Sequence, residues 1–197
     1  EGTSTENQKV RPHWEDGTPA YTIKQFGISN TYDLRQEFPA ITVRKTALKS
    51  CMDEILWIYQ KKSNNIHDLN SHIWDEWANE DGSIGKAYGY QVGKRSLHHI
   101  GNKLPLKELY PSVIAGSKKA ALYTIYMDQM DAVLFDLADT PFSRRIMISL
   151  WNPEELHEMS LEPCCWSVNF NATDEGGDKL VLNMVLNQRS NDFITAN

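Results

Sequence analysis

The most regular alternation of apolar and polar residues lies between residues 45 and 60. Apolar side chains recur there at the spacing of one helical face, which predicts an amphipathic helix with that face buried. These side chains are Leu48, Cys51, Met52, Ile55, Leu56 and Tyr59. The same spacing between Met127 and Leu137 predicts a second helix. We expect this helix to end at Asp139-Thr140-Pro141.

A shorter period, with apolar residues at alternate positions, predicts strands in the C-terminal part of the chain. It covers residues 145–151, 166–170 and 179–186. The last two ranges flank Asp174-Glu175-Gly176-Gly177-Asp178, which is typical of a hairpin turn. A further short strand is predicted at residues 38–43.

The remaining segments are less regular. Residues 1–20 are rich in Thr, Ser, Asn, Pro and Gly, so we expect them to form a loop. Residues 95–124 predict an excursion rather than a core element, because they combine Gly, Pro and Lys. Helices and strands mix without a regular βαβ rhythm, which favours an α+β fold, and 197 residues is the length of one domain.

Charge and composition narrow the classes of function. The net charge of −6 argues against a general nucleic-acid binder, although a local group of arginines could still hold a small anion. The three cysteines include an adjacent pair, so no disulfide framework is predicted and a reducing, cytoplasmic setting is expected. No apolar run reaches the length needed to span a membrane.

Cys164 is the first candidate for chemistry. Arg144 and Arg145 precede it in the sequence, and Arg189 follows it. A thiol between arginines suits a nucleophile that acts on an anionic substrate. From the pattern alone, a small buried cysteine at a strand edge is a slightly better interpretation, and adjacent arginines are more often a solvated basic pair. If the pair begins the predicted strand, its two side chains point to opposite faces.

Glu54 is the second candidate. It lies within the first predicted helix, among apolar neighbours such as Trp57 and Ile58. Loss of hydration there would raise the pKa of its carboxyl and suit it to proton transfer. The alternative is a carboxylate at the helix edge that meets water or pairs with Lys61 or Lys62, and the two interpretations are evenly balanced.

Trp74 and Trp77 flank two acidic residues. Packing at the edge of a core is the commoner use of such indole rings, and a stacking surface for a flat ligand is the alternative. His98-His99 and His157 lack partners at metal-ligand spacing, so no metal site is predicted.

A series of short segments, taken in order, resembles the thymidylate synthase family over most of the chain. The segments are Arg11 with Asp16-Gly17-Thr18, Asp53-Glu54-Ile55-Leu56-Trp57, Ile73-Trp74-Asp75-Glu76-Trp77, Tyr88-Gly89, Ser143-Arg144-Arg145, Leu150-Trp151-Asn152-Pro153, Pro163-Cys164 and Gln188-Arg189-Ser190-Asn191-Asp192. The resemblance implies a mixed β-sheet flanked by helices, with the sheets of two subunits packed back to back in a homodimer. It further implies that the chain is one domain, incomplete at both ends relative to the family, with residues 95–124 as a variable small-domain excursion.

The reaction that the resemblance implies is reductive methylation of dUMP to dTMP, with 5,10-methylenetetrahydrofolate as carbon donor and reductant and no metal. Cys164 resembles the nucleophile that adds to C6 of the uracil ring. Glu54 resembles the family's acid, which organises waters and moves protons. Tyr88 resembles the tyrosine tied to the later abstraction of a proton from C5.

The resemblance also implies three groups of binding residues. On the substrate side of the chain's own site they are Arg11, Gln188, Arg189, Ser190 and Asp192. Across the dimer interface they are Arg144 and Arg145, which would reach the phosphate bound by the partner. On the folate side they are Trp74, Trp77 and again Asp192.

Two alternatives accompany the synthase interpretation. A pyrimidine nucleotide hydroxymethylase would end the same reaction with water instead of hydride, and the match at Trp74 favours the synthase over it. A non-catalytic nucleotide-binding homologue would keep the fold without turnover.

Overall fold

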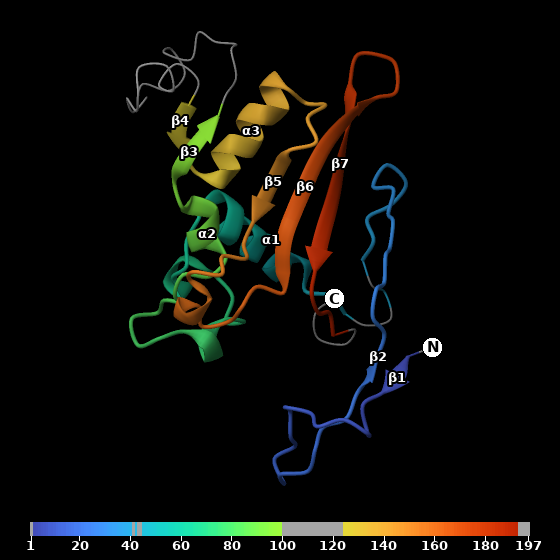
Figure 1. Cartoon of the computed structure of the whole chain (residues 1–197), viewed down its shortest axis with the longest axis vertical. Coiled ribbons are helices and arrows are strands. Elements are labelled where there is room, and N and C mark those ends of the chain that lie inside the picture. The colour runs from blue at the N-terminus through green and yellow to red at the C-terminus, as the bar shows by residue number, and fades with distance from the viewer. Residues whose placement is uncertain (1, 41, 43–44, 100–123, 193–197) are drawn as a thin grey trace. The chain divides into compact units, whose positions relative to one another are not determined.

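The computed structural model of the chain describes residues 2–40, 42, 45–99 and 124–192 (Figure 1). The chain divides into two compact units, Glu1–Val43 and Arg44–Asn197. The expectation of one domain over all 197 residues stays a prediction. Within the described ranges, no helix is both long enough and apolar enough to cross a lipid bilayer.

The first unit contains two short strands joined by a long loop. β1 (Thr3–Ser4) and β2 (Ile23–Lys24) pair antiparallel. The hydroxyl of Thr5 stabilises this pairing, because it donates to the Thr22 carbonyl at 3.2 Å and accepts from the Thr22 N–H at 2.9 Å. Most of residues 1–20 therefore form a loop, as their composition predicts.

The strand predicted at residues 38–43 is wrong for the residues described there, which are 38–40 and 42. The N–H of Ala40 donates to the carbonyl of Phe38 at 2.8 Å, and this bond closes a tight turn. Pro39 has no N–H to offer a neighbouring strand, and the Phe38 side chain is exposed. Residues 41 and 43 of the predicted strand lie outside the described residues.

The first predicted helix forms, but it begins later and changes character in its second half. α1 runs over Leu48–Ile55 and passes directly into a π-helical turn, Leu56–Gln60. Contrary to the expected buried face, no residue of α1 is buried. Burial begins in the π-helical turn at Trp57 and Ile58, and the Trp57 indole N–H donates to the Asn65 carbonyl at 3.0 Å.

Three antiparallel strands form the larger of the sheets described in the second unit. Their order is β5 (Ile146–Ser149), β6 (Cys165–Asp174) and β7 (Leu180–Gln188), and Figure 1 shows them side by side. The predicted strands and the hairpin turn at residues 174–178 are confirmed, with shifted ends.

The second predicted helix is confirmed as α3 (Gln129–Asp139), which packs on β5 (Figure 1). Asp128 caps its start, because its carboxylate accepts from the N–H of Asp131 at 2.9 Å. A shorter helix, α2 (Gly89–Gly93), contacts both α3 and β5. These contacts place α2 beside β5, which is an edge strand of the three-stranded sheet.

The excursion expected at residues 95–124 begins and ends in strands. β3 (Ser96–His99) and β4 (Thr124–Met127) pair antiparallel. Residues 100–123 lie outside the described part of the chain. The described residues of the second unit also form single turns of 3₁₀ helix at Ile66–Asp68, Asp75–Trp77 and Leu156–Glu158.

The core of the second unit joins the π-helical turn, α2 and α3 to the sheet. Its buried members are Trp57, Ile58, Leu69, Trp74, Ile84, Ala87, Tyr88, Val92, Val133, Ile146, Ile148 and Leu150. The sheet face that forms this core is unevenly covered. Leu186 of β7 shares that face with the buried Ile148 and Val168 because the three are paired in register, yet Leu186 is 45% exposed.

Candidate active site

Cys164 directly precedes β6, and the pairing of β6 with β7 brings it to the residues that follow β7. The Cys164 carbonyl accepts from the N–H of Arg189 at 2.9 Å. The hydroxyl of Ser190 lies 3.5 Å from the Cys164 sulfur and can donate to it. The thiol is half-buried, so a substrate could still reach it. The structure thus brings together Cys164 and the Arg189-Ser190 pair, which the sequence separates widely.

The guanidinium of Arg189 holds the main chain just before the thiol. Its Nε donates to the Pro163 carbonyl at 3.0 Å and its Nη2 donates to the Glu162 carbonyl at 2.8 Å. The guanidinium also lies 6.0 Å from the centre of the Trp151 ring. A guanidinium has five N–H donors, so these two bonds leave donors for an anion beside the thiol.

Tyr88 contacts the other side of Cys164. Its hydroxyl oxygen accepts from the backbone N–H of Cys164 at 3.1 Å, and its side chain is 8% exposed. Tyr88 has a φ of +37°, which is rare for a residue with a side chain. The next residue is Gly89, where any side chain would collide with the carbonyl of Ser63. This close approach fixes the turn from which the Tyr88 ring reaches Cys164.

Burial raises the pKa of Tyr88 to about 12. The bond from the Cys164 N–H opposes this rise, and negative charge on Cys164, Cys165 or Glu54 adds to it. The phenol therefore keeps its proton at neutral pH. It can accept a hydrogen bond from the main chain and still donate its own O–H to a substrate.

Glu54 lies on α1 and points toward Trp74. The indole N–H of Trp74 donates to the Glu54 carboxylate at 2.7 Å, and the Trp74 ring lies edge-on to Tyr88 with 5.2 Å between centroids. Burial raises the pKa of Glu54, while the bond from Trp74 opposes the rise. The three side chains form a continuous path from the helix carboxyl to the tyrosine beside the thiol.

The competing interpretation of Glu54 was a helix-edge ion pair with a lysine. Lys61 instead donates to the carbonyl of Asp68 at 2.6 Å. Lys62 binds the carboxylates of Asp128 and Asp131 at 2.6 and 3.1 Å. Among the described residues, the bond partner of the Glu54 side chain is the indole of Trp74. Lys61 and Lys62 are thus not the partners of Glu54, and a role for Glu54 in proton transfer stays a prediction.

Other titratable side chains in this region also favour their neutral forms. Burial raises the pKa of Cys165, and negative charge on Cys164 and Glu54 adds to the rise. Burial likewise raises the pKa of Tyr59 to about 12, with a further contribution from Cys165. The surroundings of Cys164 are thus poorly hydrated, and buried dipoles and hydrogen bonds act more strongly in such a site than in water.

The two candidate folate-side indoles differ in exposure. Trp74 is 6% exposed and serves as the donor to Glu54, whereas Trp77 is 39% exposed. Their rings meet edge to face with 5.6 Å between centroids. Trp77 is therefore the ring that offers a surface to a flat ligand. Gln188 and Asp192 are exposed near the end of β7.

The paired arginines lie apart from the thiol in sequence and in local structure. Arg144 and Arg145 are exposed in a turn before β5, so the expectation of a strand with opposite-facing side chains is wrong for them. The N–H of Arg145 donates to the Ser143 hydroxyl at 3.2 Å, and this bond stabilises the turn. Arg11 is exposed and belongs to the first unit.

Among the residues that the structure describes, no group of three His, Cys, Asp or Glu side chains could hold a metal ion. The expectation of a metal-free site stays a prediction.

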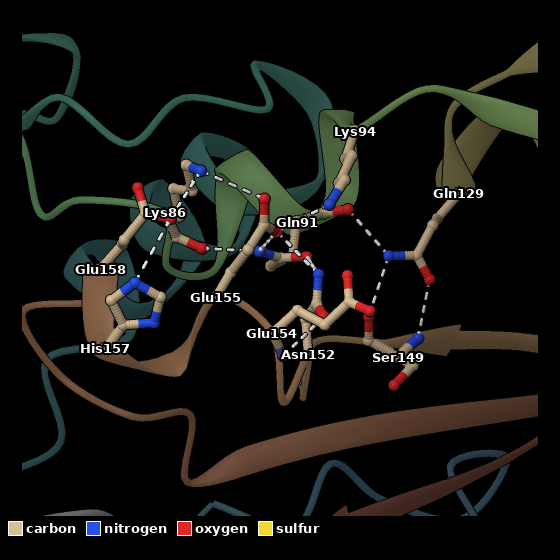
Figure 2. Close-up of polar contacts among 10 residues, drawn as sticks. All are labelled: Lys86, Gln91, Lys94, Gln129, Ser149, Asn152, Glu154, Glu155, His157 and Glu158. Carbon is tan, nitrogen blue, oxygen red and sulfur yellow. Dashed lines mark hydrogen bonds and ion pairs between the residues drawn. The ribbon is translucent and has the colours of Figure 1, made fainter.

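Sequence reasoning missed a second polar cluster, in which Glu155 accepts hydrogen bonds from Gln91, Asn152 and Lys94 (Figure 2). Glu155 stands among polar residues in an irregular segment, where no periodicity separates it from its exposed neighbour Glu154. It also missed the role of Trp74 as a donor. The sequence could have indicated the bond between Trp74 and Glu54 only if the placement of α1 relative to the turn at Asp75–Trp77 were known.

Comparison with known proteins provides an independent line of evidence. A family model described as thymidylate synthase matches residues 1–197. A thymidylate synthase from Bacillus subtilis subsp. natto is 36% identical over 200 residues, and one from Bacillus mojavensis is 37% identical over 200 residues. Each alignment covers 100% of this chain and 61% of the relative. The chain therefore spans about 61% of the length of these curated relatives.

A solved structure gives the same result. The thermostable thymidylate synthase A from Bacillus subtilis superposes with a TM-score of 0.71 at 35% sequence identity. The match covers 99% of this chain and 61% of that structure.

Proposed function

Because the chain belongs to the thymidylate synthase family, we propose that it carries the nucleophile-bearing part of an enzyme that methylates dUMP to dTMP. The observation that supports this most directly is the surroundings of Cys164. Its sulfur meets the hydroxyl of Ser190, its backbone N–H binds Tyr88, and Arg189 spans the main chain before it. These groups combine a nucleophile, a proton-carrying phenol and anion-binding donors within one site.

In this proposal the Cys164 thiolate adds to C6 of the uracil ring and forms a carbon–sulfur bond. The addition moves an electron pair to C5, which becomes a nucleophile. 5,10-Methylenetetrahydrofolate supplies the one-carbon unit and a hydride and leaves as dihydrofolate. The C5 proton is lost, and cleavage of the carbon–sulfur bond returns the thiolate and releases dTMP.

Tyr88 and Glu54 would move protons in this sequence. The phenol of Tyr88 is held at the backbone N–H of Cys164, so it suits the removal of the C5 proton with the help of a neighbouring base or water. The carboxyl of Glu54 holds its proton more tightly than an exposed glutamate does. It therefore suits proton donation to a carbonyl oxygen of the pyrimidine and the ordering of water nearby.

Binding of the two substrates follows from charge and shape. Arg189 and Ser190 would bind the phosphate of dUMP, with Arg11 and Gln188 as further substrate contacts. The exposed ring of Trp77, supported from behind by Trp74, would stack on the flat pterin. Asp192 would contact the pterin and the substrate side. A cytoplasmic location belongs to the same proposal.

The proposal is tested by trapping the covalent step. The protein, as its gene encodes it, is incubated with 5-fluoro-dUMP and methylenetetrahydrofolate and measured by intact-mass spectrometry. A base can remove hydrogen from C5 as a proton but cannot remove fluorine in the same way. The adduct with both ligands should therefore accumulate, and peptide mapping should place it on Cys164. Protein of unchanged mass, or an adduct on Cys51, would contradict the assignment.

We further propose a homodimer whose interface is the outer face of the sheet. Met147 and Val185 lie on that face in register with Asn169, and they are 46% and 60% exposed. Arg144 lines a shallow cavity of about 280 Å³ on the same face, together with Asn169, Asn171 and Val185. This face is apolar and rich in amides, and it lies beside the exposed Arg144 and Arg145, so it suits contact with a second sheet. It also suits donation of Arg144 and Arg145 to the partner's phosphate site.

Subunit complementation tests this arrangement. An Arg145→Ala chain and a Cys164→Ala chain should each be inactive, and mixing them under subunit exchange should restore roughly a quarter of wild-type activity, because half the dimers then hold one complete site of two. The double variant Arg145→Ala/Cys164→Ala, mixed with the Cys164→Ala chain, is the control that should stay inactive. Persistent inactivity of the first mixture, with exchange shown by mass, would mean that each arginine serves its own subunit.

A further inference from the structure

Glu155 is the centre of a polar cluster that the proposed reaction does not use (Figure 2). Its carboxylate accepts from the side-chain amides of Gln91 at 2.9 Å and Asn152 at 2.7 Å, and from Lys94 at 2.7 Å. Its other oxygen lies 3.3 Å from the ammonium of Lys86. The Glu155 side chain is 12% exposed. A carboxylate so enclosed is held in one position by its donors.

The bonds from Gln91 and Lys94, together with Lys86, lower the pKa of Glu155 to about 2. The group is therefore a carboxylate at every pH at which the protein would work. It does not titrate with the reaction, so a role in proton transfer does not fit it.

Gln91 connects this cluster to the backbone around Tyr88. Gln91 is 2% exposed, and its amide nitrogen donates both to Glu155 and to the carbonyl of Lys86 at 2.9 Å. Lys86 and Gln91 flank Tyr88 in sequence, so this one side chain closes the segment in which Tyr88 adopts its positive φ. Gln129 holds the same segment from α3, because its amide donates to the Gln91 carbonyl at 2.7 Å.

The partner segment leads to the thiol. Glu155 precedes Cys164 in an irregular stretch that begins after β5. Main-chain bonds pair the two segments directly, from the Lys86 N–H to the Glu158 carbonyl at 2.9 Å and from the Ser160 N–H to the Ile84 carbonyl at 3.1 Å. The side-chain cluster lies at one end of this pairing. Cys164 follows the other end, and its N–H donates to the hydroxyl of Tyr88, which lies between Lys86 and Gln91 of the cluster.

We propose that Glu155 is a positioning residue, which acts through Gln91 to hold the Tyr88 hydroxyl at the backbone N–H of Cys164, beside the nucleophile. Left-handed backbone at a residue with a side chain costs free energy and persists when surrounding contacts hold it. The cluster supplies those contacts on both sides of Tyr88. This inference rests on the proposed function, since the position of the phenol matters only if it serves the chemistry at Cys164.

The test compares Glu155→Gln with Glu154→Gln in the protein as its gene encodes it. The amide at 155 keeps the shape of the side chain but turns an N–H₂ group toward the donors of Gln91, Asn152 and the lysines. Glu154 is its exposed neighbour and carries the same chemical change. We expect Glu155→Gln to lower kcat for dUMP methylation roughly tenfold or more through misplacement of the phenol. KM for dUMP and the kcat of Glu154→Gln should stay near wild type.

A double-mutant cycle with Tyr88→Phe separates positioning from general loss of structure. If Glu155 acts through the phenol, Glu155→Gln should lower kcat much less in the Tyr88→Phe background than in wild type. The kinetic isotope effect with [5-²H]dUMP should also rise in Glu155→Gln, because removal of the C5 proton becomes slower. If Glu155→Gln does not fold, Asn152→Ala takes its place in the same cycle.

The outcomes distinguish failure of the proposed function from failure of the role proposed for Glu155. A wild-type protein that makes no dTMP would overturn the proposed function and this inference with it. An active wild type with equal kcat in Glu155→Gln and Glu154→Gln would overturn this inference alone. The same holds if Glu155→Gln lowers kcat by one factor in both backgrounds, since that result indicates a structural role unconnected with Tyr88.

Discussion

Replacing Cys164 by serine is expected to lower kcat for dUMP methylation by on the order of 10⁴-fold or more. The thiolate is the attacking group of the proposed reaction, and a serine hydroxyl at neutral pH is a far weaker nucleophile. The contacts that hold the residue would survive the change. Tyr88 binds the backbone N–H of Cys164, and Arg189 binds its carbonyl, so neither bond uses the sulfur.

The measurement is steady-state dTMP formation together with a thermal melt. Cys51→Ser is the matched control, because Cys51 is an exposed cysteine on α1 and the substitution is the same. We expect the control to keep wild-type kcat and both variants to melt near the wild-type temperature. Substantial turnover by a folded Cys164→Ser protein would contradict the covalent mechanism. If Cys51→Ser also lost turnover, the loss in Cys164→Ser could not be assigned to the nucleophile, because replacing either cysteine would have the same effect.

Replacing Glu54 by glutamine is expected to lower kcat roughly 10²- to 10⁴-fold, which is the usual contribution of a positioned acid or base. The glutamine side-chain oxygen can still accept the indole N–H of Trp74, so the geometry should persist while the proton is lost. Glu80→Gln is the control, since Glu80 is exposed and carries the same chemical change. A Glu54→Gln enzyme with near wild-type kcat would contradict the proposed role.

The pH dependence gives Glu54 a second signature. Burial raises its pKa above the ordinary 4.5, so an acid at this position stays protonated to higher pH than an exposed glutamate. Activity that depends on the protonated form should fall as pH rises through the raised pKa, and Glu54→Gln should lack this limb. The folded state holds the proton more tightly than the unfolded state, so folding stability also falls as pH rises across the same window.

Activity and stability should therefore change in opposite directions at residue 54. At neutral pH, Glu54→Gln removes the cost of keeping a charged carboxylate in a poorly hydrated site. We expect its melting temperature at neutral pH to equal or exceed that of wild type while its kcat falls. A melting temperature that drops together with kcat would instead indicate that Glu54 holds the fold together.

The parts of the fold that follow from local pattern could be predicted. The β6–β7 hairpin has alternating strands and a Gly-Gly turn, and both features act over neighbouring residues. Antiparallel pairing then brings the two ends of the hairpin together, which accounts for the contact between Ser190 and Cys164. The resemblance to the family identified these residues, and the hairpin explains why they meet.

Other features depend on distant partners and could not be predicted. The π-helical turn at Leu56–Gln60 and the positive φ of Tyr88 leave no local signal in the sequence. The conformation of Tyr88 depends on contacts with distant residues, namely the close approach of Gly89 to the Ser63 carbonyl and the bond of Gln91 to Glu155. The apolar spacing predicted a buried face on α1, but burial in this segment depends on packing partners and begins only at Trp57 in the π-helical turn. The strand expected at residues 38–43 is wrong for the described residues 38–40 and 42, because Pro39 has no N–H to donate to a neighbouring strand.

The β6–β7 hairpin also offers a site for protein engineering. Cys164 and Ser190 lie at its open end, and the closed end is the loop that follows the last strand pair, Asp174 with Leu180. At about 3.3 Å per residue, the two ends are about 30 Å apart. Gly176 and Gly177 have positive φ angles, and among the described residues no atom beyond those of the chain neighbours lies within 4 Å of a Cβ built on either of them. A short peptide tag inserted between these glycines would give the protein an immobilisation handle remote from its reactive cysteine.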